Sequence, residues 1–236
     1  QYKITGVEKI RLIHLGVETE NFTDTDGLKR MKFRREFSVD DNEIAVGIIG
    51  RLVPVKQHTL FVEIAEQVIR SAHVKPRFFI IGNGPEKRAL EKLLQQKKIT
   101  FTDAGADFNP GADLVFTSWR YDMDVVYAGL DIVMLTSLNE GTPVSIMEAM
   151  CSAKPVVSTD AGGVSELIET EKTGFIGTEK KQLTEQVLLL IDDRVKRNAI
   201  AANALEFASQ RLSKKFEVEQ LKKLYLELLQ QKQQNR

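Results

Sequence analysis

The sequence predicts an α/β protein with a single doubly wound parallel sheet covered by helices on both faces. From Glu43 onward, short apolar runs alternate with helical stretches, and this alternation indicates parallel strands joined by helices. The runs are apolar on both faces, which is typical of strands covered on both sides. The chain has 236 residues, 42% of them hydrophobic, which fits one ordinary globular domain or at most two small ones and is enough for a sizeable core. The alternating pattern favours a single domain of Rossmann-like type.

The elements are predicted in order along the chain. Residues 10–15 are compatible with a strand, and residues 27–37 with a basic helix whose charges form a solvated face. Residues 99–114 are predicted to be a loop or insertion, with its excess length at 103–114. The core strands are expected at 43–52, 77–84, 113–119, 130–137 and 154–159. The helices are expected at 58–72, at 85–98 with Pro85 as first helical residue, at 143–152 and at 213–236.

The last helix has an apolar stripe on one side. Glutamates dilute its positive charge, so packing against protein is favoured over a membrane surface. The residues of the stripe are Phe216, Leu221, Leu224, Tyr225 and Leu228.

The composition excludes several classes of protein. Lys plus Arg and Asp plus Glu both number 33, so a nucleic-acid partner is not expected. The single cysteine, Cys151, excludes an intramolecular disulfide framework and suits a reducing compartment. No apolar run is long enough for a membrane span, and no secretion signal is visible, so a cytoplasmic location is predicted. The first residue is Gln1, which suggests a piece of a longer protein.

Two cations follow the first core strand. Gly50 allows a tight turn there, and Arg51 and Lys56 can hold one phosphate group at the mouth of the sheet. The alternative is two solvated surface cations. After the second strand, GNGPEK has Lys87 where a dinucleotide-binding fingerprint needs a third glycine, so this segment is predicted to be a turn into the next helix.

The segment LTSLNEGTPVSIMEAMCSAKPVVST carries the strongest signal. Thr142 is predicted to cap a helix that begins at Pro143, and the free amides of that helix start form a phosphate site. The helix is apolar nearly all round, so Glu148 within it needs a hydrogen-bonding partner. Glu140 precedes the helix start. The order carboxylate, phosphate site, carboxylate matches the sugar, phosphates and ribose of a nucleoside diphosphate sugar.

The ordered set of motifs resembles one enzyme family. Glu140 and Glu148 form an E-x7-E pattern, and they follow IGRLVPVK, IIGNGPEKRALEKLL and the Trp119-Arg120 segment along the chain. GGVSELIETEKTGF completes the set. The chain is similar to the donor-binding domain of retaining glycosyltransferases of family 4, which have the GT-B fold. The likeness covers nearly all of residues 1–236 and implies one half of that fold.

The resemblance implies a ligand, a reaction and a role for each matched residue. The ligand is a UDP- or GDP-linked sugar, transferred to an acceptor hydroxyl with retention in cell-surface polysaccharide or glycoconjugate synthesis. Arg51 and Lys56 match the residues that hold the pyrophosphate. Glu140 matches the contact to the sugar and Glu148 the contact to the ribose, both for positioning. Arg51, Lys56 and Glu140 are the catalytic candidates, and neither a metal nor a cofactor is expected. The binding residues are Gly50, Arg51, Lys56, Trp119, Arg120, Tyr121, Glu140, Gly141, Thr142, Val144 and Glu148.

The chain departs from the family pattern in two kinds of feature. Ser118, before the base-binding loop 119–121, and Ala153, after the buried helix, stand where the family usually has glycine. The family's fold also needs an N-terminal acceptor domain, which is absent here. Residues 1–42 are then a hinge-proximal lead-in, and the chain alone is expected to be inactive. Peripheral membrane association of the full-length enzyme is left open.

Other interpretations of the sequence are less favoured. Asp122-Met123-Asp124 has the form of a metal-binding Asp-x-Asp motif, but it opens a helix, where acidic residues commonly act as caps. A non-catalytic nucleotide-binding module of the same fold remains the alternative function, although it would be expected to lose Arg51 or Glu140. A nicotinamide-dependent oxidoreductase would need the complete glycine fingerprint.

Overall fold

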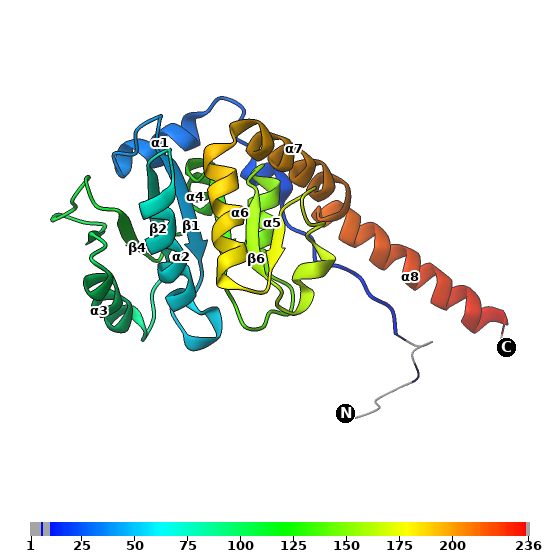
Figure 1. Cartoon of the computed structure of the whole chain (residues 1–236). Helices are drawn as coiled ribbons and strands as arrows, with labels where there is room; N and C mark the ends of the chain where they lie inside the picture. The colour runs from blue at the N-terminus through cyan, green and yellow to red at the C-terminus, as the bar shows by residue number, and fades with distance from the viewer. Residues whose placement is uncertain (1–5, 7–9, 235–236) are drawn as a thin grey trace.

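The computed structural model describes Gly6 and residues 10–234. In this part of the chain, seven parallel strands form one sheet in the order β3-β4-β2-β1-β5-β6-β7 (Figure 1). This confirms the predicted doubly wound parallel sheet. The strands are β1 (Ile44–Ile49), β2 (Pro76–Ile81), β3 (Phe101–Asp103), β4 (Leu114–Ser118), β5 (Ile132–Leu135), β6 (Val156–Thr159) and β7 (Phe175–Gly177).

Helices cover both faces of the sheet (Figure 1). Helices α1, α4 and α5 contribute to the hydrophobic cluster on one face, and α2, α3 and α6 to the cluster on the other. The α-helices are α1 (Leu28–Glu36), α2 (His58–Ser71), α3 (Lys87–Lys97), α4 (Met123–Gly129), α5 (Val144–Cys151), α6 (Lys180–Asp192), α7 (Arg194–Arg211) and α8 (Lys214–Gln234). Short 3-10 helices are η2 (Thr19–Phe22), η3 (Pro54–Lys56) and η4 (Gly162–Glu166).

Strand residues divide between the two clusters by alternation. In β5, Val133 and Leu135 pack with the α1 and α5 side, whereas Ile132 and Met134 pack with the α2 and α6 side. Successive side chains of a strand point to opposite faces, so a strand buried on both faces must be apolar throughout. This explains why these strands read as continuous apolar runs in the sequence.

The order of the strands sets the loops after β1 and β5 apart at the carboxyl edge of the sheet, and the place between these loops is called the crevice below. Strand β1 lies between β2 and β5, and the chain winds outward from β1 in one direction before it returns to β5 on the other side. The loops that follow β1 and β5 therefore diverge at the carboxyl ends of these strands. Ligands of open parallel sheets bind in such a crevice.

Several predicted boundaries are wrong. Residues 10–15 form no strand, and Leu12 in this segment is 71% exposed. The predicted insertion at 99–114 contains the edge strand β3, and the edge strand β7 was not predicted. Each of these strands has only three residues, which is too short to show a periodic pattern. Pro85 lies in a turn, and α3 begins two residues later, at Lys87.

The prediction that the charges of helix 27–37 form a solvated face is wrong for two of its arginines. Arg34 is buried, and its Nη1 atom lies 3.0 Å from the Asp131 carboxylate, which also pairs with Arg30 at 2.7 Å. Asp131 accepts a further hydrogen bond from the Ala45 amide of β1. Phe33, between the two arginines, is fully buried in the core. Helix α1 is therefore tied to the sheet and belongs to the core of the domain, beyond a lead-in role.

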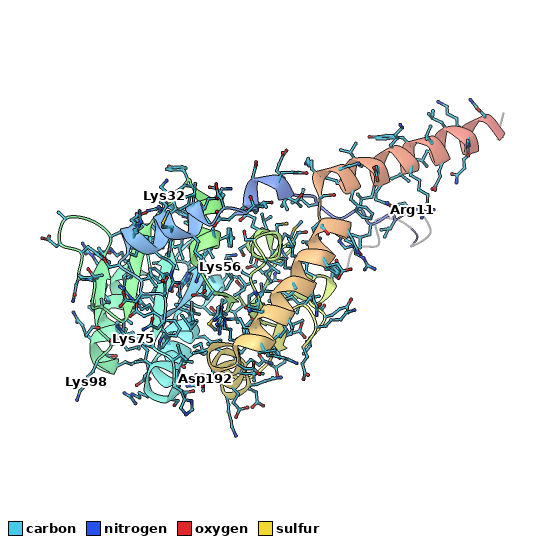
Figure 2. All side chains as sticks on the ribbon, turned by 90° about the horizontal axis from the view of Figure 1, so that it is seen from above. Arg11, Lys32, Lys56, Lys75, Lys98 and Asp192 are labelled. Carbon is cyan, nitrogen blue, oxygen red and sulfur yellow. The ribbon has the colours of Figure 1, made fainter. Side chains whose placement is uncertain are left out.

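Helix α8 extends away from the rest of the molecule (Figure 1, Figure 2). The predicted long C-terminal helix is confirmed, but most of its apolar stripe is not covered by this chain, since Tyr225 is 66% and Leu228 51% exposed. Within the residues that the structure describes, no helix combines the length and apolarity needed to cross a membrane.

Candidate functional site

The loops after β1 and β5 are tied together at the crevice. The Leu138 amide donates to the Val55 carbonyl at 2.8 Å. The Thr136 hydroxyl lies 3.0 Å from the carbonyl oxygens of both Lys56 and Gln57. These bonds fix η3, which carries Lys56, against the segment that leads to α5. Two loops separated widely in sequence therefore form one wall of the crevice.

This arrangement brings Lys56 and Glu140 into contact. The Lys56 ammonium lies 2.6 Å from the Glu140 carboxylate, although the two residues are 84 positions apart. Ser137 donates a hydrogen bond of 2.6 Å to the same carboxylate oxygen. Both charged side chains are half-buried, with 24% of Lys56 and 12% of Glu140 exposed. An ion pair with a second hydrogen bond in a partly dry site holds both groups in a fixed orientation.

Arg51 is the second cation of the crevice. Its side chain is exposed and has no hydrogen-bonding or ionic partner among the described residues. A guanidinium presents five N–H donors and suits the bidentate recognition of phosphate. The loops after β1 and β5 therefore carry one paired cation, one cation without a partner among the described residues and one carboxylate, and all three residues were named as candidates from the sequence.

Two adjacent glycines support the Glu140 loop from behind. The Gly163 amide donates to the Glu140 carbonyl at 3.3 Å. A Cβ atom on Gly162 would lie 2.0 Å from that carbonyl oxygen, and one on Gly163 would lie 2.2 Å from the Gly141 oxygen. Such distances cannot be tolerated by a real side chain. Neither glycine was predicted to belong to the site, although a Gly-Gly pair shortly after the apolar strand β6 was the available signal.

The start of α5 differs slightly from the prediction. The helix begins at Val144, the capping position is Pro143, and Thr142 makes no capping hydrogen bond through its side chain. The Pro143 carbonyl accepts the first helical hydrogen bond, from Ile146 at 3.0 Å. The amide groups of the first turn precede this bond and have no partner within the helix. Gly141, Thr142 and Val144 are all exposed beside them, so the helix start that was predicted to bind phosphate lies one residue later and is open to solvent.

Glu148 has the partner that a carboxylate in an apolar helix requires. The hydroxyl of Tyr127, from α4, lies 2.9 Å from the Glu148 carboxylate and 3.1 Å from the Ser145 carbonyl. Tyr127 is fully buried, whereas Glu148 is half-buried. Burial raises the pKa of Glu148, and the hydrogen bond from Tyr127 opposes this increase. The prediction of a hydrogen-bonding role is confirmed, and the phenol fixes the carboxylate in place.

The loop 119–121 has two exposed aromatic rings and one arginine that is engaged elsewhere. Trp119 is 55% and Tyr121 97% exposed. Arg120 pairs with the carboxylates of Glu36 and Asp122, and its hydrogen bonds to Glu36 raise its pKa. The guanidinium of Arg120 therefore joins this loop to the end of α1. Of the three residues expected around a base, Trp119 and Tyr121 have rings that are exposed to solvent, whereas Arg120 is held in ion pairs.

Comparison with known proteins identifies the domain. Residues 29–207 match the family model described as glycosyl transferases group 1, which is more than half of the chain. The chain belongs to this family. α-D-Kanosaminyltransferase of Streptomyces kanamyceticus is 27% identical over 224 residues, which are 92% of this chain and 54% of that enzyme. The chain spans about half the length of the curated relatives it matches.

Solved structures agree with the group 1 assignment. HepE of Anabaena, in complex with UDP and glucose, is 26% identical and matches with a TM-score of 0.77. This match covers 93% of the chain described here and 57% of HepE. The C-terminal domain of LpcC from Francisella tularensis is 22% identical and matches with a TM-score of 0.69. This match covers 84% of the chain described here and 100% of the LpcC domain. The latter match shows that the fold is that of the C-terminal half of a group 1 glycosyltransferase.

Both departures from the group 1 glycine pattern fall on left-handed backbone. Ser118 has φ of 60° and Ala153 has φ of 51°. At Ala153, the amides of Ala153 and Lys154 donate to the Met150 and Ala149 carbonyls, at 3.0 and 2.9 Å. This is the Schellman arrangement, in which glycine is preferred at the left-handed position. Ser118 and Ala153 therefore adopt the left-handed turn geometry that glycine would have, at the cost of strain in the backbone.

We expect Ala153→Gly to stabilise the domain by about 0.5–1 kcal/mol. Glycine relieves the strain of the left-handed backbone in the folded state, and this gain in free energy is larger than the loss caused by the greater entropy of the unfolded chain. Denaturation with urea measures this change. Ala202→Gly is the matched control on α7, where the same substitution in an exposed helix should destabilise by about 1 kcal/mol. A loss of stability with Ala153→Gly would contradict this account of the turn.

The remaining candidates have structural roles in this group 1 domain. Asp122 pairs with Arg120, and Asp124 lies 3.1 Å from the Lys29 ammonium, so both carboxylates of the Asp-x-Asp motif have cationic partners. Asp122 occupies the capping position of α4 but makes no capping bond through its side chain. No cluster of three or more potential metal-binding side chains occurs in the part of the chain that is described. Cys151 is buried, as predicted.

The glycines of GNGPEK also have a role that the sequence did not reveal. A Cβ atom on Gly82 would lie 2.0 Å from the Gly50 oxygen, and one on Gly84 would lie 2.4 Å from the Leu52 oxygen. The loop after β2 therefore packs directly on the backbone of the loop that carries Arg51. Close backbone approach, rather than only a turn into α3, explains these glycines.

Proposed function

We propose that this domain binds the donor, a nucleoside diphosphate sugar, for a retaining glycosyltransferase that transfers the sugar to an acceptor hydroxyl. The proposed setting is cell-surface polysaccharide or glycoconjugate synthesis. The observation that supports it is the meeting of Lys56 and Glu140 beside the unpaired Arg51 and the start of α5. A non-catalytic module would have no need for this combination of charges.

The diphosphate is proposed to lie between the two cations and the start of α5. The Lys56 ammonium has three donors and gives one to Glu140, so the others are available for phosphate oxygens. Arg51 and the first amides of α5 supply further donors. Negative charge develops on the leaving diphosphate as the glycosidic bond breaks, and groups already held in place stabilise that charge most effectively.

The two carboxylates are proposed to hold opposite ends of the donor. Glu148 lies four residues inside α5, about 6 Å along the helix at 1.5 Å per residue, which suits a ribose beyond the phosphates. Glu140 precedes the helix and faces the position of the transferred sugar. Trp119 and Tyr121 offer flat apolar surfaces for the base. HepE was solved with UDP, and a Mycobacterium tuberculosis relative is named as GDP-mannose-dependent, so a uridine or guanosine donor is proposed.

The acceptor is proposed to bind to a further domain. The support is that the curated relatives are about twice as long as the matched region. The exposed apolar residues of α8, such as Tyr225 and Leu228, offer a surface against which such a domain could pack. A relative from Escherichia coli is named for a diphosphoundecaprenol-linked sugar, which supports a cytoplasmic enzyme acting at a membrane.

The first test measures binding of UDP and GDP to this chain by calorimetry. Arg51→Ala should weaken the preferred nucleotide by about 2 kcal/mol or more, because a phosphate loses a charged donor. Arg88→Ala, which removes an exposed arginine from α3, is the matched control and should leave the dissociation constant unchanged. Equal affinities for the wild type and Arg51→Ala would mean that Arg51 is a surface cation.

A second test separates the two carboxylates. Glu148→Ala should weaken the bare nucleoside diphosphate by about tenfold or more, because the ribose loses a charged acceptor. Glu140→Ala should leave the bare nucleotide nearly unaffected but abolish any gain in affinity that the attached sugar provides. Calorimetry with UDP and UDP-glucose, or with GDP and GDP-mannose, measures both effects. The reverse pattern would show that the proposed direction of the donor along α5 is wrong.

A further inference from the structure

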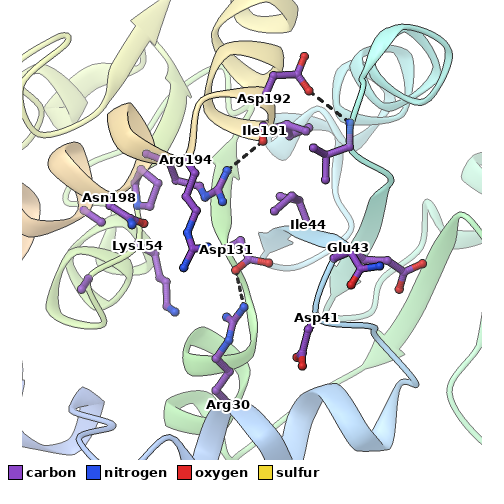
Figure 3. A pocket seen from close by; sticks show the side chains of 16 residues that line it. Arg30, Asp41, Glu43, Ile44, Asp131, Lys154, Ile191, Asp192, Arg194 and Asn198 are labelled. Atoms are coloured by element: carbon purple, nitrogen blue, oxygen red, sulfur yellow. Dashed lines mark hydrogen bonds and ion pairs between the residues drawn. The ribbon is translucent and has the colours of Figure 1, made fainter.

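A cavity lies at the opposite end of the sheet from the loops that carry Lys56 and Glu140. Its volume is about 700 Å³. Ile44 at the start of β1, Asp131 just before β5 and Pro155 just before β6 line one side, and the junction of α6 and α7 lines another (Figure 3). Because the strands are parallel, these positions all lie at the amino ends of the sheet. The cavity is therefore separate from the site proposed for the donor.

Three cations of this cavity have unused hydrogen-bond donors. The Lys154 ammonium donates to the Ala128 carbonyl at 3.0 Å and has no carboxylate within ion-pair distance among the described residues. Arg194 has no side-chain partner in that part of the chain. One guanidinium nitrogen of Arg197 donates to two carbonyl groups at the end of α6, and its other N–H groups remain available. Lys154 and Arg194 lie on the same side of the cavity (Figure 3).

Two of the four carboxylates that line the cavity, Asp131 and Glu43, are paired with lysine or arginine side chains. Asp131 is shared between Arg30 and Arg34, at 2.7 and 3.0 Å. Asp41 has no side-chain partner among the described residues and lies across the cavity from Lys154 (Figure 3). Glu43 pairs with Lys75, whereas Asp192 accepts a hydrogen bond of 3.1 Å from the His73 amide and lies 3.0 Å from the His73 ring. The cavity thus has a cationic side with unmatched donors and a single unmatched acceptor opposite.

The cations on this side of the cavity lack a negatively charged partner among the described residues. Burial, together with the nearby charge of Arg30, lowers the pKa of Lys154 to about 8. A half-buried ammonium beside arginines, with one neutral acceptor, is stabilised by a negatively charged ligand. Arg194 is the first residue of α7, and the start of this helix is capped by the Asp193 carboxylate, which accepts a hydrogen bond from the Lys196 amide at 2.8 Å, so the positive charge of this side comes from the three side chains.

We propose that this cavity binds a small phosphomonoester that carries hydroxyl groups, such as a sugar phosphate. Lys154 and Arg194 hold the phosphate, and Arg197 supplies a further donor. Asp41 accepts a hydrogen bond from a hydroxyl group on the other side. The volume exceeds that of a phosphate ion alone and leaves room for the body of such a molecule. This site does not depend on the proposed binding of the donor sugar.

The test is a titration of the 236-residue chain, followed by calorimetry and by amide NMR shifts, with glucose 6-phosphate, inorganic phosphate and glucose. We expect the ester to bind more tightly than phosphate, glucose not to bind, and the shifts to concentrate at Asp41, Lys154 and Asn198. Lys154→Met and Arg194→Ala should each weaken binding of the ester by about tenfold or more, because its phosphate group loses a charged donor.

Two controls exclude binding at the other candidate phosphate site and misfolding of the Lys154 variant as explanations. Arg51→Ala disables the other phosphate-binding candidate and should leave the affinity for glucose 6-phosphate unchanged. Lys154→Met should keep or raise the thermal midpoint, because it removes an uncompensated charge, so weaker binding cannot be attributed to misfolding. The proposal is overturned if Lys154→Met binds the ester as the wild type does, if the shifts occur only near Gly50 and Gly141, or if phosphate binds as tightly as the ester.

Discussion

Acidification from pH 7 to pH 4 is expected to remove about 3 kcal/mol of stability through His58 alone. His58 is fully buried at the start of α2, and neither ring nitrogen has a hydrogen-bond partner among the described residues. Burial lowers the pKa of His58 to about 4, with a smaller contribution from the charge of Lys56. The unfolded chain, with a pKa of 6.5, takes up this proton first, so folding is progressively penalised as the pH falls from 6.5 to 4.

The comparison of variants isolates this effect from other titrating groups. Urea unfolding of the wild type and of His58→Leu at pH 7, 5 and 4 should give a difference that grows by about 2 kcal/mol at pH 5 and about 3 at pH 4. Contributions from other groups, including Glu148, cancel in the difference between the two proteins. His14→Gln, at a partly exposed histidine, is the control and should follow the wild type. Parallel pH profiles for the wild type and His58→Leu would contradict the burial of an unpaired imidazole.

Gly162→Ala is expected to destabilise the domain by about 3 kcal/mol or to displace the Glu140 loop, because its Cβ would meet a backbone oxygen at 2.0 Å. Gly162 also has φ of 55°, which disfavours any side chain. Either response should weaken nucleotide-sugar binding by about tenfold or more, since Glu140 and the adjacent amides would move from their positions. Urea unfolding and calorimetry with the nucleotide sugar measure the two responses.

Gly141→Ala is the matched control for stability. Gly141 lies in the loop that Gly162 and Gly163 support, and a Cβ atom there would have no neighbour within 4 Å. We expect its free energy of unfolding to remain within about 0.5 kcal/mol of the wild type. If Gly162→Ala were as stable as Gly141→Ala and bound the nucleotide sugar as tightly as the wild type does, the Gly-Gly turn would not be a support of the site.

The charged residues of the crevice could be predicted because strand order determines where loops meet. Arg51 and Lys56 follow one buried strand and Glu140 follows another, and carboxyl ends of parallel strands lie at the same edge of a sheet. The contact between Lys56 and Glu140 then required only that the two strands be neighbours, which β1 and β5 are. The need of Glu148 for a partner was also predictable, from the cost of an isolated carboxylate in an apolar helix.

The identity of partners was beyond the sequence. Tyr127, which holds Glu148, lies on another helix, and nothing in its local pattern distinguishes it from an ordinary core aromatic. Arg120 was expected near a base, but Glu36 and Asp122 engage it from two directions. Pairings of this kind depend on distances between side chains of different elements, which hydrophobic periodicity does not contain.

The sequence by itself determined the fold class, the core strands, the helices α2, α3, α5 and α8, and the side of the sheet on which the candidate site lies, whereas α6 and α7 were not predicted. It did so because apolar periodicity follows from which faces must be buried, and because parallel strands expose their loops at one edge. Only the tertiary structure decided the edge strands β3 and β7, the close backbone contacts at Gly82 and Gly162, and the role of Arg34 in binding Asp131. These features arise where separate segments meet, so their physical cause is the geometry of packing rather than the local preference of any residue.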